Sequence, residues 1–167
     1  MYLRLSSENI AAACTDTALL TTASSSAAFA DNLKVCAEKH HILPELANFA
    51  VPFGQILYKP STAAQYWFTA ICVAEQSGIS VSVTWIVMVL VICLVLSVAT
   101  PPVPGGTTAS FSILFTQLGL PTEKLAVVLT LNVILDFFRT ATNLFAGQCI
   151  LIETSRKMGL VAKQNEN

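Results

Sequence analysis

The feature that most constrains this chain is a long stretch without ionisable charge. From residue 76 to residue 122 there is no Asp, Glu, Lys or Arg, and residues 81–99 are continuously apolar apart from small hydroxyl residues and one Trp. A bilayer core of ~30 Å accommodates a helix of about 20 such residues. A core helix of a large soluble protein is the alternative. However, only 11% of the 167 residues are charged, against about 25% in soluble domains. The sequence therefore predicts a membrane protein.

Composition excludes several other classes of protein. A hydrophobic content of 54% with few charges excludes disorder, and a net charge of −1 leaves no basic face for nucleic acid. His40 and His41 lie in a polar stretch and are expected to be solvated, so no Ser/His or Cys/His arrangement suggests an enzyme. No metal site and no cofactor are predicted. The five cysteines are widely spaced, which favours buried small hydrophobes over disulfides or zinc ligands: Cys14, Cys36, Cys72, Cys93 and Cys149.

Helix-breaking residues divide the apolar sequence into four blocks. The first contains a run of small residues at 21–26, mostly hydroxyls, which is typical of a turn. The second is interrupted at 58–62, where Pro60 lacks the N–H that a helix interior needs. The third holds three Pro and two Gly at positions 101–106. Such backbone is tolerated at membrane depth only where it is buried in protein or lines a cavity. The fourth block is a long helix after Pro121.

Blocks one and three share one plan, in which two apolar arms meet at a tip of small residues and a spanning segment follows. This plan is typical of secondary transporters, where broken helices build the substrate site. We predict an all-α membrane protein with two re-entrant helical hairpins and two spanning helices, the first of these broken mid-membrane. The expected segments are 1–33, the end of a membrane helix and the first re-entrant hairpin; 34–45, a cytoplasmic joint; 46–78, the broken membrane helix; 79–119, the second re-entrant hairpin; 122–153, the second membrane helix; and 154–167, a cytoplasmic tail.

The fourth block carries a stripe of polar residues. At 100° per residue, five polar side chains fall on one helix face, and large apolar residues cover the rest: Asn132, Asp136, Arg139, Thr140 and Asn143. A charge in a membrane helix costs at least ~2.5–3.5 kcal/mol, so Asp136 and Arg139 are expected to face a cavity or each other. One interpretation is a self-neutralising pair that only packs the helix. The other is a site for a zwitterion, because Arg139 matches a carboxylate and Asp136 an ammonium. The second interpretation points to an amino acid.

Taken together, these motifs resemble the dicarboxylate/amino acid:cation symporter family, which includes the glutamate and aspartate transporters. That family has a serine-rich tip on its first hairpin and an Asn-Met-Asp-Gly-Thr break on its seventh helix. It has a Val-Pro-Gly tip on its second hairpin and an Asp-x-x-Arg-Thr-x-x-Asn pattern on its eighth helix. The corresponding segments here occur in the same order over nearly the whole chain: 24–26, 58–62, 103–106 and 136–143.

The resemblance implies a role for each matching residue. Arg139 would bind the side-chain carboxylate of the substrate, Asp136 its amino group, and Thr140 and Asn143 its main carboxylate region, with Thr62 also reaching the substrate. The two tips would donate backbone groups and act as gates: Ser24, Ser25 and Ser26 on the first, and Val103, Pro104 and Gly105 on the second. The implied activity is secondary active transport of an amino acid, acidic and similar to aspartate or glutamate, or of a dicarboxylate. Asp136 favours an amino acid over succinate or malate.

The sequence departs from the family at its cation sites. Tyr58 and Pro60 replace two sodium-coordinating side chains, and Gly147 stands where the eighth helix has a carboxylate. The altered region comprises Tyr58, Lys59, Asn143 and Gly147. The resemblance therefore leaves the coupling ion open between sodium and a proton. Two hypotheses fit Lys59: its ammonium takes the place of a lost cation and makes transport independent of sodium, or it snorkels to an aqueous vestibule.

The resemblance also implies partners outside this chain. Family members are much longer and form a homotrimer through an N-terminal scaffold of membrane helices, which is absent here. The alternative function is a truncated, non-transporting remnant or subunit that needs a separate scaffold chain. Basic residues flank the blocks on one side, which predicts a multi-pass protein of the cell membrane with the C-terminus in the cytoplasm: Lys34, Lys39, Arg156 and Lys157. The expected partners are a small-molecule substrate and the lipid bilayer, and no nucleic acid.

Overall fold

A computed structural model describes residues 29–103 and 105–161 of the chain. Within these two ranges every regular element is a helix, and strand-like pairing is limited to one isolated bridge between Ile42 and Val161. The predicted all-α class is confirmed. The predictions made for Cys14, for the tip at 24–26 and for Pro104 lie outside the described residues. The elements are α2 (Phe29–Glu38), α3 (Pro44–Leu57), α4 (Pro60–Gln76), α5 (Val83–Ala99), α6 (Thr107–Leu118), η2 (Thr122–Lys124) and α7 (Leu125–Lys157).

The second apolar block forms two consecutive helices. Pro44 and Pro60 each stand in the first turn of a helix, α3 and α4 respectively, where the missing N–H is no loss. Tyr58 and Lys59 lie between them in non-helical conformations. Pro52 lies inside α3 without ending it. The break therefore occurs where the sequence places it, directly before Pro60.

The third block forms a pair of helices joined by a short connection. The side chain of Ser82 caps α5 by accepting a hydrogen bond from the Trp85 N–H at 3.2 Å. The helix ends at Ala99, before the first two prolines, and α6 begins at Thr107. Within the connection, a Cβ on Gly106 would lie 2.5 Å from the Pro101 carbonyl oxygen, so this close backbone approach requires glycine.

The fourth block is dominated by one long helix. α7 has 33 residues and follows the short helix η2, and Gly119 in a left-handed conformation (φ 63°) ends α6 before it. Among the described residues, the continuous helical segment Thr122–Lys157 is the one helix long and apolar enough to cross a membrane. α5 is apolar but has 17 residues.

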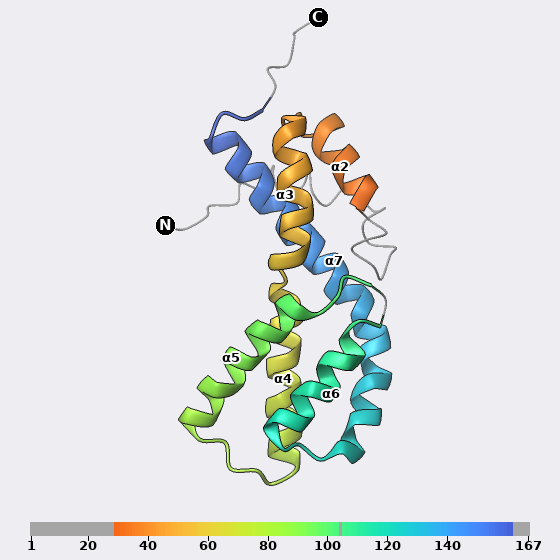
Figure 1. Ribbon diagram of the computed structural model, residues 1–167, viewed down its shortest axis with the longest axis vertical. Coiled ribbons are helices and arrows are strands. Elements are labelled where there is room, and N and C mark those ends of the chain that lie inside the picture. The colour runs from red at the N-terminus through yellow and green to blue at the C-terminus, as the bar shows by residue number, and fades with distance from the viewer. Residues whose placement is uncertain (1–28, 104, 162–167) are drawn as a thin grey trace, which may run out of the picture.

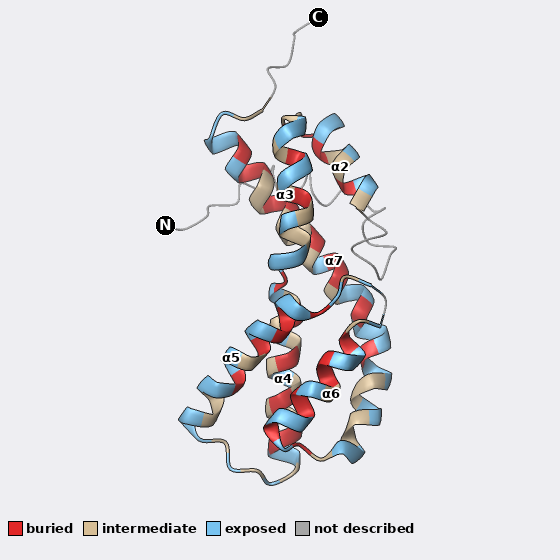
Figure 2. Ribbon diagram, in the orientation of Figure 1, coloured by how far each residue is buried: buried red, intermediate tan, exposed pale blue. Residues whose placement is uncertain are grey.

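The helices pack around two separate cores along an elongated molecule (Figure 1). α7 runs along most of its length, α3 and α4 follow one another beside α7, and α5 and α6 flank α4. The larger core joins α4, α5 and α6 and includes the edge-to-face ring pair of Tyr66 and Phe111. The smaller core joins α2, α3 and the end of α7, around Cys36 and Ile152. Figure 2 shows that buried faces line both groups of helices while their outer faces are exposed.

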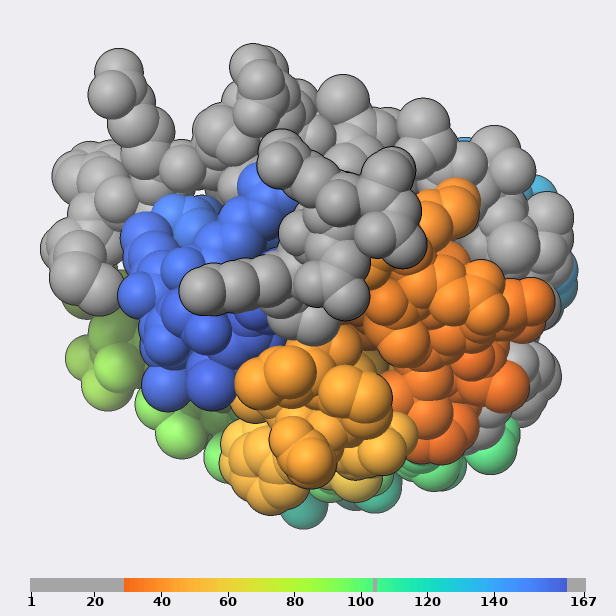
Figure 3. All heavy atoms as spheres, turned by 90° about the horizontal axis from the view of Figure 1, so that it is seen from above, coloured from red at the N-terminus to blue at the C-terminus, as the bar shows by residue number. Residues whose placement is uncertain are grey.

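The polar joint after α2 is more compact than the sequence predicts. α2 continues to Glu38, and the chain then turns at His41, which has a φ of 52°. The Leu43 N–H donates to the Leu160 carbonyl at 3.2 Å, which holds the joint against the end of α7. His40 is buried, with 6% of its surface exposed, so the expectation that it is solvated is wrong. Seen from this end, α2, α3 and the end of α7 lie next to one another (Figure 3).

The described cysteines have no disulfide bonds. Cys36, Cys93 and Cys149 are buried and Cys72 is half-buried. All four lie in helices. Cys36, Cys93 and Cys149 are therefore buried as predicted, whereas Cys72 is only partly buried.

Candidate functional site

The two central charges of α7 pair with each other. Asp136 and Arg139 form an ion pair one turn apart, and 9% of each side chain is exposed. The second guanidinium nitrogen of Arg139 donates to the Gln65 Oε1 at 2.9 Å and to the Asn132 Oδ1 at 3.2 Å. The charges therefore lie inside the protein, on the face of α7 turned toward α4, in agreement with the predicted polar stripe.

Gln65 and Thr107 extend this network, and no sequence pattern marks either residue as part of the site. The Gln65 Nε2 donates to the Asn132 Oδ1 at 3.1 Å, and the Asn132 Nδ2 donates to the Thr107 Oγ1 at 2.8 Å. Asn132 lies one helical turn before Asp136 on the polar stripe that the sequence predicts. Gln65 and Thr107 come from α4 and α6 and carry no comparable signal. The network thus joins three helices through side-chain amides and a hydroxyl.

The start of α4 is attached to α7 by a second set of hydrogen bonds. The Asn143 Oδ1 accepts from the Ser61 N–H at 2.9 Å, and the Asn143 Nδ2 donates to the Thr62 Oγ1 at 3.0 Å. The Ser61 N–H is one of the N-terminal amides of α4 that have no partner within the helix. Asn143 therefore satisfies the backbone that the break leaves open.

The end of α5 is the third component. Thr100 caps α5, and its Oγ1 donates to the Leu96 carbonyl at 2.7 Å and bonds the hydroxyls of Tyr66 at 2.8 Å and Ser110 at 2.9 Å. The Lys59 Nζ, from the break between α3 and α4, donates to the carbonyl oxygen of Thr100. The lysine is 8% exposed. The break and the α5–α6 connection are thus in direct contact.

These three components enclose a small pocket of about 30 Å³. Six residues predicted as substrate contacts line it: Thr62, Val103, Asp136, Arg139, Thr140 and Asn143. Lys59, Thr100, Pro101 and Pro102 complete the wall. Gly105 lies in the same connection but does not line the pocket. The polar groups come from one face of α7, the break and the end of α5, so the fold gathers side chains that are far apart in the sequence.

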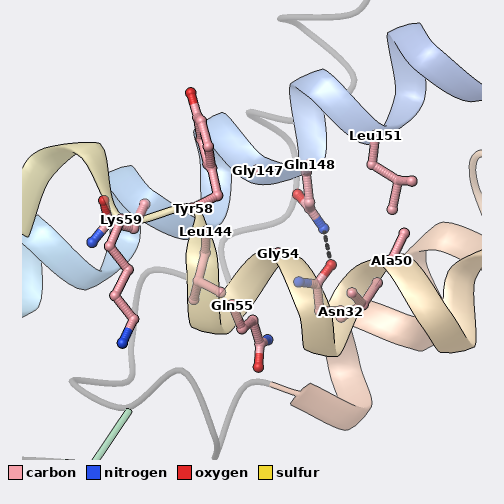
Figure 4. A pocket seen from close by; sticks show the side chains of 12 residues that line it. Asn32, Ala50, Gly54, Gln55, Tyr58, Lys59, Leu144, Gly147, Gln148 and Leu151 are labelled. Carbon is pink, nitrogen blue, oxygen red and sulfur yellow. Dashed lines mark hydrogen bonds between the residues drawn. The ribbon is translucent and has the colours of Figure 1, made fainter. Parts of the chain in front are cut away.

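A second pocket of about 40 Å³ lies beside the first, between α3 and α7 (Figure 4). All four residues of the predicted cation region line it: Tyr58, Lys59, Asn143 and Gly147. A Cβ on Gly147 would lie 3.8 Å from the Tyr58 Cδ1, so the tyrosine ring stands in the space next to the glycine. Figure 4 shows Asn32 and Gln148 joined by a hydrogen bond of 2.9 Å at the far side.

The second pocket offers little to a metal ion. Among its described lining residues there is no carboxylate, and the only charged group is the Lys59 ammonium. Two buried amide atoms at this pocket, the Gln148 Oε1 and the Gln55 Nε2, have no hydrogen-bond partner. One is an acceptor and the other a donor, which suits a water molecule better than a bare cation.

Known proteins resemble the chain over most of its length. It is 27% identical to excitatory amino acid transporter 3 of Mus musculus over 146 residues, which are 84% of this chain and 28% of that protein. It is 27% identical to excitatory amino acid transporter 5 of Homo sapiens over 124 residues, which are 74% of this chain and 22% of that protein. Excitatory amino acid transporter 1 of Rattus norvegicus is 25% identical over the same length. The chain thus spans about a quarter of the length of these relatives.

A family model also matches most of the chain. The sequence profile of the sodium:dicarboxylate symporter family matches residues 11–156. This range includes both pockets and every residue that lines them. The chain therefore belongs to the sodium:dicarboxylate symporter family, a family of membrane transporters.

Proposed function

We propose that this chain is the substrate-binding part of a secondary transporter for an acidic amino acid similar to aspartate or glutamate. The observation that carries this proposal is the buried Asp136–Arg139 pair in the wall of a polar pocket. A ligand with a carboxylate and an ammonium can pair its carboxylate with Arg139 and its ammonium with Asp136, and so separate the two side chains. The names of the relatives, excitatory amino acid transporters, support the same substrate class.

In this proposal each pocket residue has a role. Arg139 binds the side-chain carboxylate of the substrate, since its planar fork matches a carboxylate with two hydrogen bonds. Asp136 accepts hydrogen bonds from the amino group. Thr140 and Asn143 bind the main carboxylate region, and Thr62 contacts the substrate from the start of α4. The tip residues Val103, Pro104 and Gly105 act as one gate of the site, and Ser24, Ser25 and Ser26 act as the other.

The pocket of about 30 Å³ supports a gating role for the α5–α6 connection. This volume holds roughly two water molecules, since one needs at least ~10–15 Å³. An amino acid enters only if the connection moves away and the Asp136–Arg139 pair opens. The described conformation is therefore a closed state of the site.

The helix lengths support the predicted membrane arrangement. α6 has 12 residues and rises about 18 Å, which is less than the ~30 Å hydrocarbon core. We infer that the segment 79–119 enters and leaves the membrane on one side as a re-entrant hairpin and that 1–33 holds the first such hairpin. The spanning segments are then 46–78, broken at Lys59, and 122–153. The joint 34–45 and the tail 154–167 lie in the cytoplasm.

A complete transporter needs elements beyond this chain. The proposal includes scaffold membrane helices supplied outside these residues, and assembly of the completed protein as a homotrimer. The coupling ion is sodium or a proton. The second candidate is a non-transporting remnant or subunit that associates with a separately encoded scaffold chain. A neighbouring gene for the missing membrane helices would support a split transporter, and its absence a remnant.

Equilibrium binding tests the substrate assignment. The detergent-solubilised chain is titrated with aspartate, glutamate, neutral amino acids and dicarboxylates, and Arg139→Ala is compared with Arg156→Ala, an exposed arginine on the same helix. We expect Arg139→Ala to weaken aspartate binding on the order of hundredfold, since it removes the guanidinium that binds the side-chain carboxylate of the substrate. Arg156→Ala should bind as the parent does. Equal aspartate affinity in the parent and Arg139→Ala would contradict the assignment.

A further inference from the structure

Lys59 is a buried cation without a carboxylate partner among the described residues. It is 8% exposed, and the ion pairs described within residues 29–103 and 105–161 join Arg139 to Asp136 and Lys157 to Glu153. Its ammonium instead donates to the carbonyl oxygen of Thr100. A lysine that snorkels to water would keep its charged end exposed. The low exposure therefore excludes the snorkelling hypothesis and requires another role for the charge.

The surroundings of Thr100 form a position for a positive charge. α5 ends at Ala99, and the last carbonyls of a helix have no partner within it and carry its negative dipole end. The next two residues, Pro101 and Pro102, have no N–H to offer. The Lys59 ammonium thus lies at the negative end of α5, where it donates to the Thr100 carbonyl oxygen.

We propose that Lys59 is a resident cation that holds the α5–α6 connection closed over the pocket, in place of an exchangeable metal ion. The ammonium bonds the last carbonyl of α5 from the break between α3 and α4, and so joins the two irregular segments that bound the pocket. Closure of the connection then requires no sodium at this position. The contact between Lys59 and Thr100 does not depend on the proposed function. Its consequence, that this position does not couple transport to sodium, rests on the proposed function.

The neighbouring pocket supports this assignment. Gly147 replaces a carboxylate that the family resemblance implies, and the ring of Tyr58 lies in the space next to it. The ammonium is not drawn toward that region, because the described lining residues there carry no negative charge. The Lys59 ammonium therefore interacts with the end of α5 and not with the altered region around Gly147.

Hydrogen–deuterium exchange of the full chain in detergent tests the proposal without any substrate. The amides of residues 103–108 are followed in sodium chloride and in choline chloride at equal concentration. In the parent, replacing choline with sodium should leave their exchange unchanged. In Lys59→Met, exchange in choline should be about ten- to a hundredfold faster, because a hydrogen bond from a charged donor is lost. Sodium should then slow it, because the vacant position admits a metal cation.

Lys59→Arg is the matched variant, since it keeps the positive charge and should stay close to the parent. The amides of residues 144–156, in the second half of α7, report whether each variant is folded. Sodium-dependent protection of 103–108 in the parent would overturn the proposal even if Lys59→Met did not fold. Equal exchange in the parent and Lys59→Met, or equal acceleration in the Met and Arg variants, would also overturn it. A chain that binds no amino acid leaves this readout intact, so the two proposals fail separately.

Discussion

The two halves of α7 differ in the side chains that they expose. In the first half, up to Thr140, the buried residues are polar, Asn132, Asp136 and Thr140, while Phe138 is 69% exposed. In the second half the buried residues are mixed, with apolar Leu144 and Ile152 beside polar Gln148 and Glu153, and the last turn exposes Arg156 and Lys157. Large exposed apolar residues are therefore typical of the first half, and exposed charges of the second.

This difference indicates that the two halves meet different surroundings. Exposed Phe, Ile and Val side chains have no free-energy cost in contact with lipid, whereas a charged side chain in a membrane helix costs at least ~2.5–3.5 kcal/mol. The first half places its apolar residues outward and its charges in the pocket. The second half exposes Arg156 and Lys157 in its last turn and contributes Leu151 and Ile152 to the core that it shares with α2 and α3. The change falls close to the pocket, so the site lies near the boundary between the two patterns.

The largest expected difference in stability between the two halves of α7 follows from removing one buried charge. Arg139→Ala leaves the Asp136 carboxylate buried without its partner, so we expect it to lower the free energy of unfolding by about 3–5 kcal/mol. Arg156→Ala, at the exposed end of the same helix, should stay within about 0.5 kcal/mol of the parent. Unfolding in mixed detergent micelles measures both. Similar losses in the two variants would mean that the halves do not differ.

A lysine on each exposed face gives the next largest effect. Phe138→Lys places a charge on the face that we assign to lipid, and should make membrane insertion of the α7 segment less favourable by ~2.5–3.5 kcal/mol. Met158→Lys, just after the helix at 64% exposure, should change insertion by less than about 0.5 kcal/mol. An insertion assay with a glycosylation reporter compares them. A costly Met158→Lys would place the end of the helix in lipid as well.

The smallest expected effect concerns the hydrogen-bond network on the buried face of the first half of α7. Asn132→Ala removes a partner of Arg139, Gln65 and Thr107 at once, so the unsatisfied groups should lower the free energy of unfolding by about 1–3 kcal/mol. Thr142→Ala, on the exposed side of α7, is the control and should change it by less than about 0.5 kcal/mol. Denaturant unfolding of both variants provides the comparison. An Asn132→Ala variant as stable as the control would show that the network adds nothing.

Much of this arrangement is readable from the sequence, because it depends on local rules. Pro60 and the prolines and glycines at 101–106 cannot continue a helix, so both breaks fall where they were predicted. The spacing of Asn132, Asp136 and Asn143 fixes which face of α7 is polar, since helical geometry leaves no other choice.

Contacts between distant segments were not predictable in this way. Gln65 and Thr107 join the network through packing of α4 and α6, and no periodicity marks them. His40 was expected to be solvated because its neighbours are polar, but the turn at His41 folds the joint onto the end of α7. The direction of the Lys59 side chain likewise depends on where the end of α5 comes to lie, which only the tertiary structure decides.

The length of α7 has a consequence for how the site communicates with its surroundings. At 1.5 Å per residue its 33 residues rise about 50 Å, well beyond the ~30 Å of hydrocarbon in a bilayer. Unless the helix tilts strongly, about 20 Å of it projects into the headgroups and the aqueous phase. Asp136 and Arg139 lie on the same continuous helix as the exposed Arg156 and Lys157, so a displacement of that end along the helix axis would also displace one wall of the pocket.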